Sequence, residues 1–544
     1  MALWPGDIPL NDDWSYGEGV RHFLNTGKFY LPTVCAGGFP HVLLGALFCK
    51  VLGFSYGHLR LASLFMTLAG VIAFYQAAYL VSRSSSRSLW FTLVYAFNPI
   101  LVNVCFSFMS DASGLALNVI FIYLALLALK NGSSRALAAS SLTLAMATTV
   151  RQSSIILGLI FLPAMLKKNA GNLSRAWCLS ALAPSALALV LADNWLEGRA
   201  SRGELIATDY TLVRQAHHQF IAGFADHLLP QLARSNEVLF QSLCYLALFC
   251  LPLLPFLLAG CFKKLKSHKL HRPLLGFCAA AALFLGLAVY GTAVVNHCTM
   301  PFSENIWRVT TVGAQGIMGI AHPTLSHRQR VSLTVFSYIS ASILLGLAFW
   351  FLLSVLKRKP FLGKSRGRSI LAPSLLILTG CAIGFIAVET AVRTTDRYDL
   401  FALVPTLLCL ILLSRYLRVN PGALTRALVV AFAIYSVCGG EDYLASNRAR
   451  FSLIRKLENQ GVTYKDIDGG AEYNIQNDLS VYTHTEKRGT PRDNWRWWSI
   501  HGEQYIVSFS PVPGYIEVMK AGYFSLLSFR REFVLMLKSE DGNK

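Results

Sequence analysis

The feature that most constrains this chain is a series of long apolar segments separated by short basic connectors. Of its 544 residues, 54% are hydrophobic and only 14% are charged, whereas a soluble protein carries about a quarter charged residues. Several segments approach the roughly 20 apolar residues needed to cross a bilayer. We therefore predict an all-α polytopic membrane protein embedded in the lipid bilayer.

The distribution of charge predicts which connectors lie in the cytoplasm. The formal net charge is +20. Six connectors hold 21 of the 49 Lys and Arg residues and no Asp or Glu, which leaves 28 basic against 29 acidic residues elsewhere. An excess of basic residues marks cytoplasmic loops, and its confinement to them argues against a nucleic-acid partner. The six connectors are 82–88, 130–135, 167–175, 261–272, 357–369 and 415–426.

Counting crossings between these connectors predicts three regions. Residues 1–57 form a first outer loop that carries an acidic pair and juxtamembrane helices, because the apolar stretch 41–54 is too short to span and suits an interfacial helix. Residues 58–440 form the transmembrane domain. Residues 441–544 are less apolar and form a small α/β or β-rich extracytoplasmic domain. The expected twelve crossings lie near 58–81, 88–107, 112–130, 136–150, 153–167, 176–194, 238–260, 273–295, 333–356, 370–391, 399–415 and 426–440.

One consequence of this topology concerns the start of the chain. No span or signal peptide precedes the outer segment 1–57 that could carry it across the membrane. Either this short start crosses the membrane together with the first hairpin, or a preceding first helix has been lost from the chain, and we favour the loss. In addition, the hairpin 136–150 and 153–167 is short and need not cross completely.

Two adjacent carboxylates, Asp12 and Asp13, are the first candidates for chemistry. Carboxylates at an outer interface can deprotonate an acceptor hydroxyl or amine, or hold a divalent cation. The alternative is a solvated loop or a pair that caps the helix expected at 15–25, for which one of them suffices. The metal requirement stays open.

Further candidates lie at the outer ends of predicted spans. Asp111 could line a polar cavity, since carboxylates at membrane depth are costly, or it could cap the helix that follows. Arg151 could bind a phosphate in a bidentate manner, or extend to the lipid headgroups.

A third outer helix end holds Arg397 and Tyr398. Arg397 could bind phosphate, or Asp396 or Asp399 could simply pair with it. In the long outer loop, His217 and His218 could serve as ligands or acid–base groups, although adjacent histidines in a polar loop are usually plain surface residues. In the tail, turns and packing explain the Gly-Gly of 467–474 and the tryptophans of 495–498, and a sugar-stacking platform is the alternative for the latter.

These motifs, in this order, resemble the membrane glycosyltransferases of the GT-C class that use lipid-linked sugars. The branch is that of protein mannosyltransferases, aminoarabinose transferases and similar bacterial enzymes. The matching residues include Asp12-Asp13, Tyr16 to Phe23, Gly27-Lys28-Phe29, the helix from Pro40 to Gly53 and Arg60-Leu61-Ala62-Ser63. Also similar are Phe97-Asn98-Pro99, Ser110-Asp111, Thr149-Val150-Arg151, Arg397-Tyr398 and, in the tail, the run 467–474.

The resemblance implies a GT-C fold and a sugar donor carried on a polyprenyl phosphate. Transfer would invert the anomeric carbon at the outer face of a bacterial inner membrane, and the acceptor would be a glycan, a lipid or a protein. Asp12 would be the general base and Asp13 its partner or an orienting group. Asp111 would face the same cavity, and Arg151 and Arg397 would neutralise the lipid phosphate.

The alternative function is a transporter or flippase for a lipid-linked substrate. Such proteins often contain inverted repeats and charged residues at the bilayer midplane. The sequence shows no repeat, and its candidate polar residues lie at predicted helix ends. These observations favour surface chemistry over transport.

Overall fold

The computed structural model describes most of the chain. The described residues are 6–32, 38–166, 175–200, 214–215, 218–219, 222–223, 228–267, 281, 299–302, 306–309, 325–357, 368–392, 396–478, 504–512, 514–527 and 529–538. His217, the tryptophans of 495–498 and all of the predicted crossing at 273–295 except residue 281 lie outside them.

The first half of the described chain is built from helices. In chain order they are α1 (Asp13–Thr26), α2 (Phe39–Leu52), α3 (Tyr56–Ser82), α4 (Ser85–Ala96), α5 (Pro99–Cys105), α6 (Ser110–Asn131), α7 (Ser134–Val150), the 3₁₀ helix η1 (Gln152–Phe161), α8 (Leu162–Leu166), α9 (Arg175–Ser180) and α10 (Ala183–Ala200).

The second half continues the bundle and ends in a small sheet. Its elements are α12 (Leu228–Cys250), η2 (Leu251–Leu253), α13 (Leu254–Ser267), α15 (His327–Lys357), α16 (Arg368–Val392), η4 (Asp396–Tyr398), α17 (Asp399–Leu417), α18 (Ala423–Asn459), η5 (Tyr464–Asp466), β1 (Ile467–Asp468), α19 (Ala471–Asn477), β2 (Tyr505–Ser508), β3 (Tyr515–Ser525) and β4 (Phe529–Lys538).

Among the described residues, seven helices are long and apolar enough to cross a membrane. The pair α4 and α5 makes an eighth if it counts as one span, although it bends by 64° at Phe97–Asn98. The proline after Asn98 explains the break, because it cannot continue a helix. Three shorter apolar helices, including α2 and the Gln152–Leu166 stretch, agree with the expected interfacial helix and the short hairpin. The predicted polytopic α-helical fold is confirmed.

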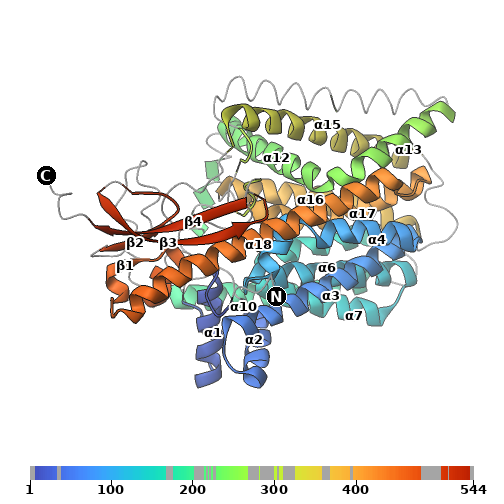
Figure 1. Ribbon diagram of the computed structural model, residues 1–544. Coiled ribbons are helices and arrows are strands. Elements are labelled where there is room, and N and C mark those ends of the chain that lie inside the picture. The colour runs from blue at the N-terminus through green and yellow to red at the C-terminus, as the bar shows by residue number, and fades with distance from the viewer. Residues whose placement is uncertain are drawn as a thin grey trace.

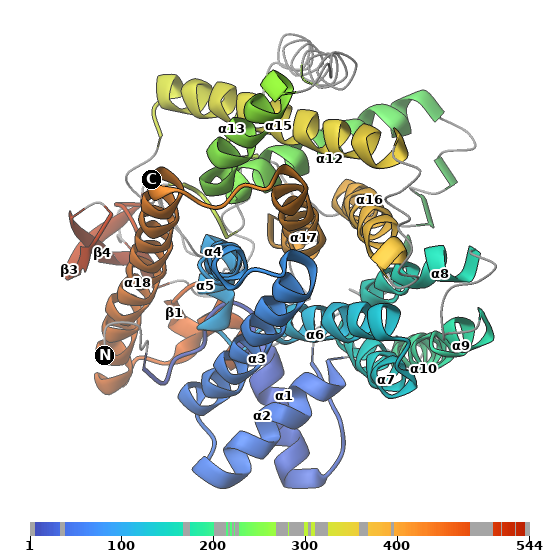
Figure 2. The same cartoon turned by 90° about the vertical axis from the view of Figure 1, so that its right-hand side faces the viewer.

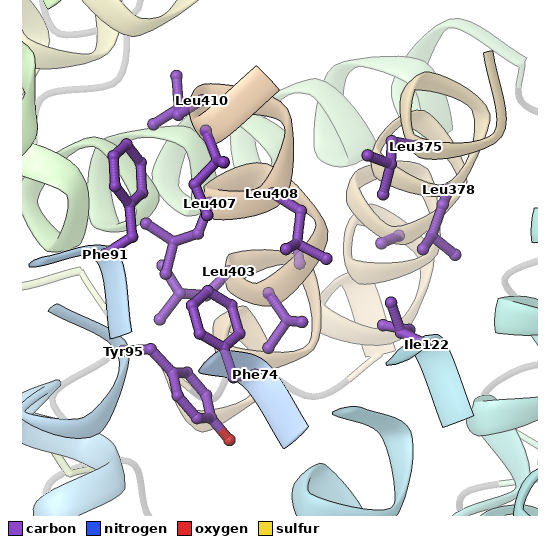
Figure 3. Close-up of a cluster of buried hydrophobic side chains, with 14 of the residues drawn as sticks. Phe74, Phe91, Tyr95, Ile122, Leu375, Leu378, Leu403, Leu407, Leu408 and Leu410 are labelled. Carbon is purple, nitrogen blue, oxygen red and sulfur yellow. The ribbon is translucent and has the colours of Figure 1, made fainter. Parts of the chain in front are cut away.

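Tight packing between helices holds the bundle together. In a bilayer, apolar side chains gain little by leaving lipid, so close contact carries the association. A Cβ added to Gly70 of α3 would lie 3.0 Å from the Ala116 backbone of α6, so these helices meet through small residues. Figure 3 shows the centre of the bundle, where Phe74 of α3 lies beside Tyr95 of α4 and Leu403 of α17, and side chains of α16 and α6 lie on the other side of α17. The Phe74 and Tyr95 rings stack with their centroids 4.8 Å apart.

The C-terminal region is a small α/β unit attached to the bundle by one long helix. Figure 1 shows α18 running from the bundle to the sheet. The strand order is β1-β2-β4-β3, with β1 and β2 parallel and the other pairs antiparallel. The Asp442 carboxylate on α18 accepts hydrogen bonds from the Ser525 hydroxyl and from the Leu526 and Leu527 amides, and so pins the β3–β4 hairpin to the helix. The expected small sheet of the tail is confirmed, whereas the domain bounds 441–544 and the outer placement stay predictions.

Contacts between connectors agree with the prediction that the six basic connectors share one side of the bundle and the candidate site residues share the other. At one end of the bundle, Arg415 donates to the Val81 carbonyl, Arg87 to the Asn420 side chain and Lys264 to the Tyr416 carbonyl. All these residues lie in or next to predicted cytoplasmic connectors. The predicted outer residues meet one another instead, in the cluster described below.

Candidate active site

The acidic pair begins α1, and its two carboxylates have different environments. Asp12 is the N-cap residue of α1, yet its side chain makes no capping hydrogen bond. The Asp12 side chain is 42% exposed, whereas that of Asp13 is fully buried. Capping therefore does not account for Asp12, and only Asp12 presents a carboxylate to the surface.

Asp13 is enclosed by the start of α3 and by the turn before α6. One of its oxygens accepts from Arg60 at 3.0 Å and the other from the Phe108 amide at 2.5 Å. Arg60 also donates to the carbonyls of Gly6 and Ile8. Burial raises the pKa of Asp13 to about 7, against the opposing effects of Arg60 and of the Phe108 amide. This geometry suits a group that holds the loop in place.

The exposed carboxylate belongs to a four-residue charge cluster formed by Asp12, Asp111, Arg151 and Arg397. Arg151 lies 2.6 Å from one Asp111 oxygen, and Arg397 lies 3.5 Å from the other. Arg397 also lies 3.4 Å from an Asp12 oxygen. The four residues come from the starts of α1, α6 and α17 and from the end of α7, so the fold joins positions far apart in the sequence.

The charge cluster is partly enclosed and holds two unsatisfied donors. Arg397 is 10% exposed and Asp111 is 5% exposed, while Arg151 is 24% exposed. Within the described part of the chain, the buried Nε atoms of Arg151 and Arg397 have no hydrogen-bond partner. Buried polar atoms are normally paired, and the described residues supply no partner for these two donors.

Neighbouring residues fix the orientation of the cluster. The N-cap of α6 is Met109 rather than Ser110 or Asp111, which leaves the Asp111 carboxylate for the two arginines. Tyr398 lies under the Arg151 guanidinium, with 5.5 Å from the Arg151 Cζ to the ring centroid, an attractive cation–π arrangement. The Asp396 carboxylate accepts from the Ile306 and Trp307 amides, so Arg397 pairs with Asp12 and Asp111 instead.

Two side chains to which the sequence assigned no role support this end of α6. The Tyr16 hydroxyl donates to Ser110 Oγ at 2.7 Å. His41 of α2 is buried, with its ring nitrogens 2.9 Å from Ser113 Oγ and 3.2 Å from the Phe108 carbonyl oxygen. A titratable residue in an apolar helix is costly unless it is paired. That cost was the available signal for His41, and likewise for Arg60 in the first turn of α3.

The other sequence candidates are not joined to the cluster. His218 is exposed, and no hydrogen bond or ion pair of the described residues links it to the four charges. The described residues also contain no group of three or more His, Cys, Asp or Glu side chains that could hold a metal ion. The possible divalent cation therefore stays a prediction.

Comparison with known proteins found similar solved structures but no similar sequences. No family model and no curated protein matches the chain. ArnT from Cupriavidus metallidurans, solved with bound undecaprenyl phosphate, shares 13% identity over 99% of this chain and 96% of its own, with a TM-score of 0.38. The archaeal oligosaccharyltransferase AglB from Archaeoglobus fulgidus, solved with an inhibitory peptide and a dolichol-phosphate, shares 13% identity over 91% of this chain, with a TM-score of 0.36.

The extent of these two matches differs. The chain spans 56% of AglB but nearly all of ArnT. At TM-scores below 0.5 the likeness defines neither substrate nor mechanism, which have to be argued from the charge cluster.

Proposed function

We propose that this chain is an integral membrane glycosyltransferase that moves a sugar from a polyprenyl phosphate to an acceptor at the outer face of a bacterial inner membrane. The observation that carries the proposal is the ion pair between an uncapped, exposed carboxylate, Asp12, and Arg397, which Asp111 links to Arg151. A base and an anion site side by side are what such a transfer needs.

In the proposed reaction, an acceptor hydroxyl or amine attacks the anomeric carbon opposite the phosphate. The bond between that carbon and the phosphate oxygen breaks, which inverts the configuration. The proton of the acceptor passes to Asp12. The electron pair of the broken bond stays on the phosphate, whose charge goes from one negative to nearly two at neutral pH.

Arg151 and Arg397 stabilise the growing phosphate charge. Guanidinium groups bind phosphate through paired N–H donors, and in a water-poor site each such contact is stronger than in solution. Asp111 and Asp12 together balance the charge of the two arginines before the donor binds, because two carboxylates and two guanidinium groups carry no net charge. Tyr398 and the pairing with Asp111 keep the Arg151 guanidinium in position.

The phosphate role is tested by donor affinity. Arg151→Ala and Arg397→Ala are each expected to weaken the binding of polyprenyl phosphate in lipid vesicles by about 10- to 100-fold, since charge-assisted hydrogen bonds contribute roughly 1.5–3 kcal/mol. Arg87→Ala is the matched control, because Arg87 bonds to Asn420 at the other end of the bundle. Wild-type affinity in both cluster variants would refute the role.

The sugar and the acceptor are best identified in the cell envelope. Mass spectrometry of envelope glycans, lipids and proteins with and without the gene should show the loss of one sugar from one acceptor class. A set of envelope glycoconjugates that does not change would contradict the proposal. Accumulation of an unbroken lipid-linked sugar on the cytoplasmic side would favour the flippase instead.

A further inference from the structure

The chain just before Asp12 is built into the core of the C-terminal unit. Ile8 and Leu10 are buried in an apolar cluster whose other buried members all come from residues 443–535, among them Ile454 and Ile467. The Arg455 side chain of α18 also donates to the Asp7 carbonyl. The first outer loop and the tail are thus one packed unit around residues 7–10.

A buried carboxylate of the tail, that of Glu472, extends this contact to Asn11, the residue before Asp12. Glu472, in the first turn of α19, is 4% exposed. One of its oxygens accepts from the Asn11 backbone N–H at 3.2 Å, and the other accepts from Arg450 at 3.0 Å. Glu472 therefore holds the residue that directly precedes the exposed carboxylate.

The turn that presents Glu472 is itself fixed by hydrogen bonds. The Asp468 carboxylate accepts from the Gly470 N–H and from the Asn474 side-chain amide, and the Asn474 side-chain oxygen Oδ1 accepts from the Gly469 N–H. Gly470 has φ +97°, a conformation that favours glycine. The run 467–474 thereby forms a rigid support at the start of α19.

Asn11 directly precedes Asp12 and has an unusual backbone conformation. Its φ is +55°, a left-handed conformation that Asn tolerates better than most residues. Its side chain lies 3.1 Å from the Met109 sulfur, next to the start of α6. Because Asp12 makes no capping hydrogen bond, the position of its carboxylate depends on this backbone and on Arg397.

We propose that Glu472 is a positioning residue, through which the tail segment 467–474 fixes Asn11 and so aims Asp12 toward Arg397. This inference rests on the proposed function. It assigns the tail a role in catalysis, although none of its residues has to touch the substrate.

The test uses two double variants that share one change. Arg450→Leu with Glu472→Gln and Arg450→Leu with Glu472→Leu both remove the buried ion pair, so neither leaves a lone buried charge. Only the Gln variant keeps an oxygen that can accept from the Asn11 N–H. Glu458→Gln is the control, because Glu458 accepts from the Tyr473 hydroxyl in the same unit without contacting residues 6–13.

Two readouts separate positioning from folding. In hydrogen–deuterium exchange of the full-length protein, the peptide containing Asn11 should exchange faster in the Leu double variant than in the Gln double variant. In the transfer assay, kcat of the Leu double variant should fall about 10- to 100-fold below that of the Gln double variant, since small misplacements of a catalytic group cost that much. KM for the lipid-linked donor should change less than twofold.

The outcomes keep this inference distinct from the proposed function. Equal hydrogen–deuterium exchange of the Asn11 peptide in the two double variants would refute the claim that Glu472 anchors Asn11, whether or not the wild type transfers sugar. Faster exchange with an equal loss of kcat in the Glu458→Gln control would reduce Glu472 to a structural residue and overturn the positioning role. A wild type that exchanges as expected but transfers no sugar would contradict the proposed function and would leave only the anchoring of Asn11 by Glu472.

Discussion

The same substitution should affect different properties at the adjacent carboxylates Asp12 and Asp13: the transfer rate at one and the stability of the fold at the other. Asp12→Asn and Asp13→Asn each replace a carboxylate with an amide of nearly the same size. The 42% exposed Asp12 side chain has one ion pair, at 3.4 Å, whereas Asp13 is fully buried between Arg60 and the Phe108 amide. The first change should therefore act on catalysis and the second on stability.

The expected size for Asp12→Asn follows from its exposure and its role. Exposed ion pairs contribute about 0–1 kcal/mol, so the melting temperature should hardly change. Removal of a general base lowers the rate by about 10²- to 10⁴-fold, which corresponds to roughly 3–5 kcal/mol in the activation barrier.

Asp13→Asn should instead lower the free energy of unfolding. Breaking a buried ion pair costs about 3–5 kcal/mol because the partner, Arg60, keeps its charge. Because burial raises the pKa of Asp13 to about 7, the charged form is disfavoured in the folded state at neutral pH, and the neutral Asn avoids that cost. What remains is the donor that the single Asn oxygen leaves unpaired, so we expect a net loss of about 1–3 kcal/mol.

Stability and the transfer rate can both be measured on protein in detergent or nanodiscs. Thermal melting is followed by tryptophan fluorescence, and sugar transfer is measured on the folded fraction. Arg60→Met combined with Asp13→Asn serves as the control, since it removes both charges and should recover part of the stability. Full transfer by Asp12→Asn, or equal destabilisation by the two single substitutions, would refute this division of roles.

Two further predictions concern the packing around α2. Burial lowers the pKa of His41 from 6.5 to about 4, so the folded state excludes a proton that the unfolded state accepts. His41 thus contributes stability above pH 6.5 that is progressively lost as the pH falls to 4, by about 3 kcal/mol in total; a His41→Gln variant with the same acid sensitivity in melting experiments would contradict this. A Cβ added to Gly45 would lie 2.4 Å from the Phe108 ring, so Gly45→Ala should cost about 1–3 kcal/mol. Gly380→Ala, where nothing lies within 4 Å, should leave stability equal or higher; equal melting of the two glycine variants would show that Phe108 moves freely.

Much of the fold followed from patterns that act locally. Apolar segment length and basic connectors predicted the helical bundle, and Pro40 and the short apolar run predicted the interfacial helix α2. The bend between α4 and α5 at Phe97–Asn98 was missed, because hydropathy averages over a proline that interrupts a span.

The candidate site could be predicted only as a set of positions. Counting crossings placed Asp12, Asp111, Arg151 and Arg397 on one side, and the structure brings these four together through ion pairs. The different burial of Asp12 and Asp13 was not visible in the sequence. It depends on Arg60 and on the Phe108 amide, which are distant in the chain and become neighbours only through helix packing.

The tail was the least predictable part. Its α/β character followed from composition, but the contact of Glu472 with Asn11 joins residues 461 positions apart. No local pattern indicates such a partner. The same holds for Ile8 and Leu10, which look like loop residues and complete the apolar core of the tail.

The central claim is that the charge cluster catalyses sugar transfer from a lipid phosphate. Its most direct test is product analysis of purified protein in vesicles that contain a polyprenyl-phosphate-linked sugar and an envelope-derived acceptor. We predict free polyprenyl phosphate and glycosylated acceptor in equal amounts from the wild type, and both formed about 10²- to 10⁴-fold more slowly by Asp12→Asn. A donor that remains intact, or that moves across the vesicle membrane with its sugar still attached, would contradict the account.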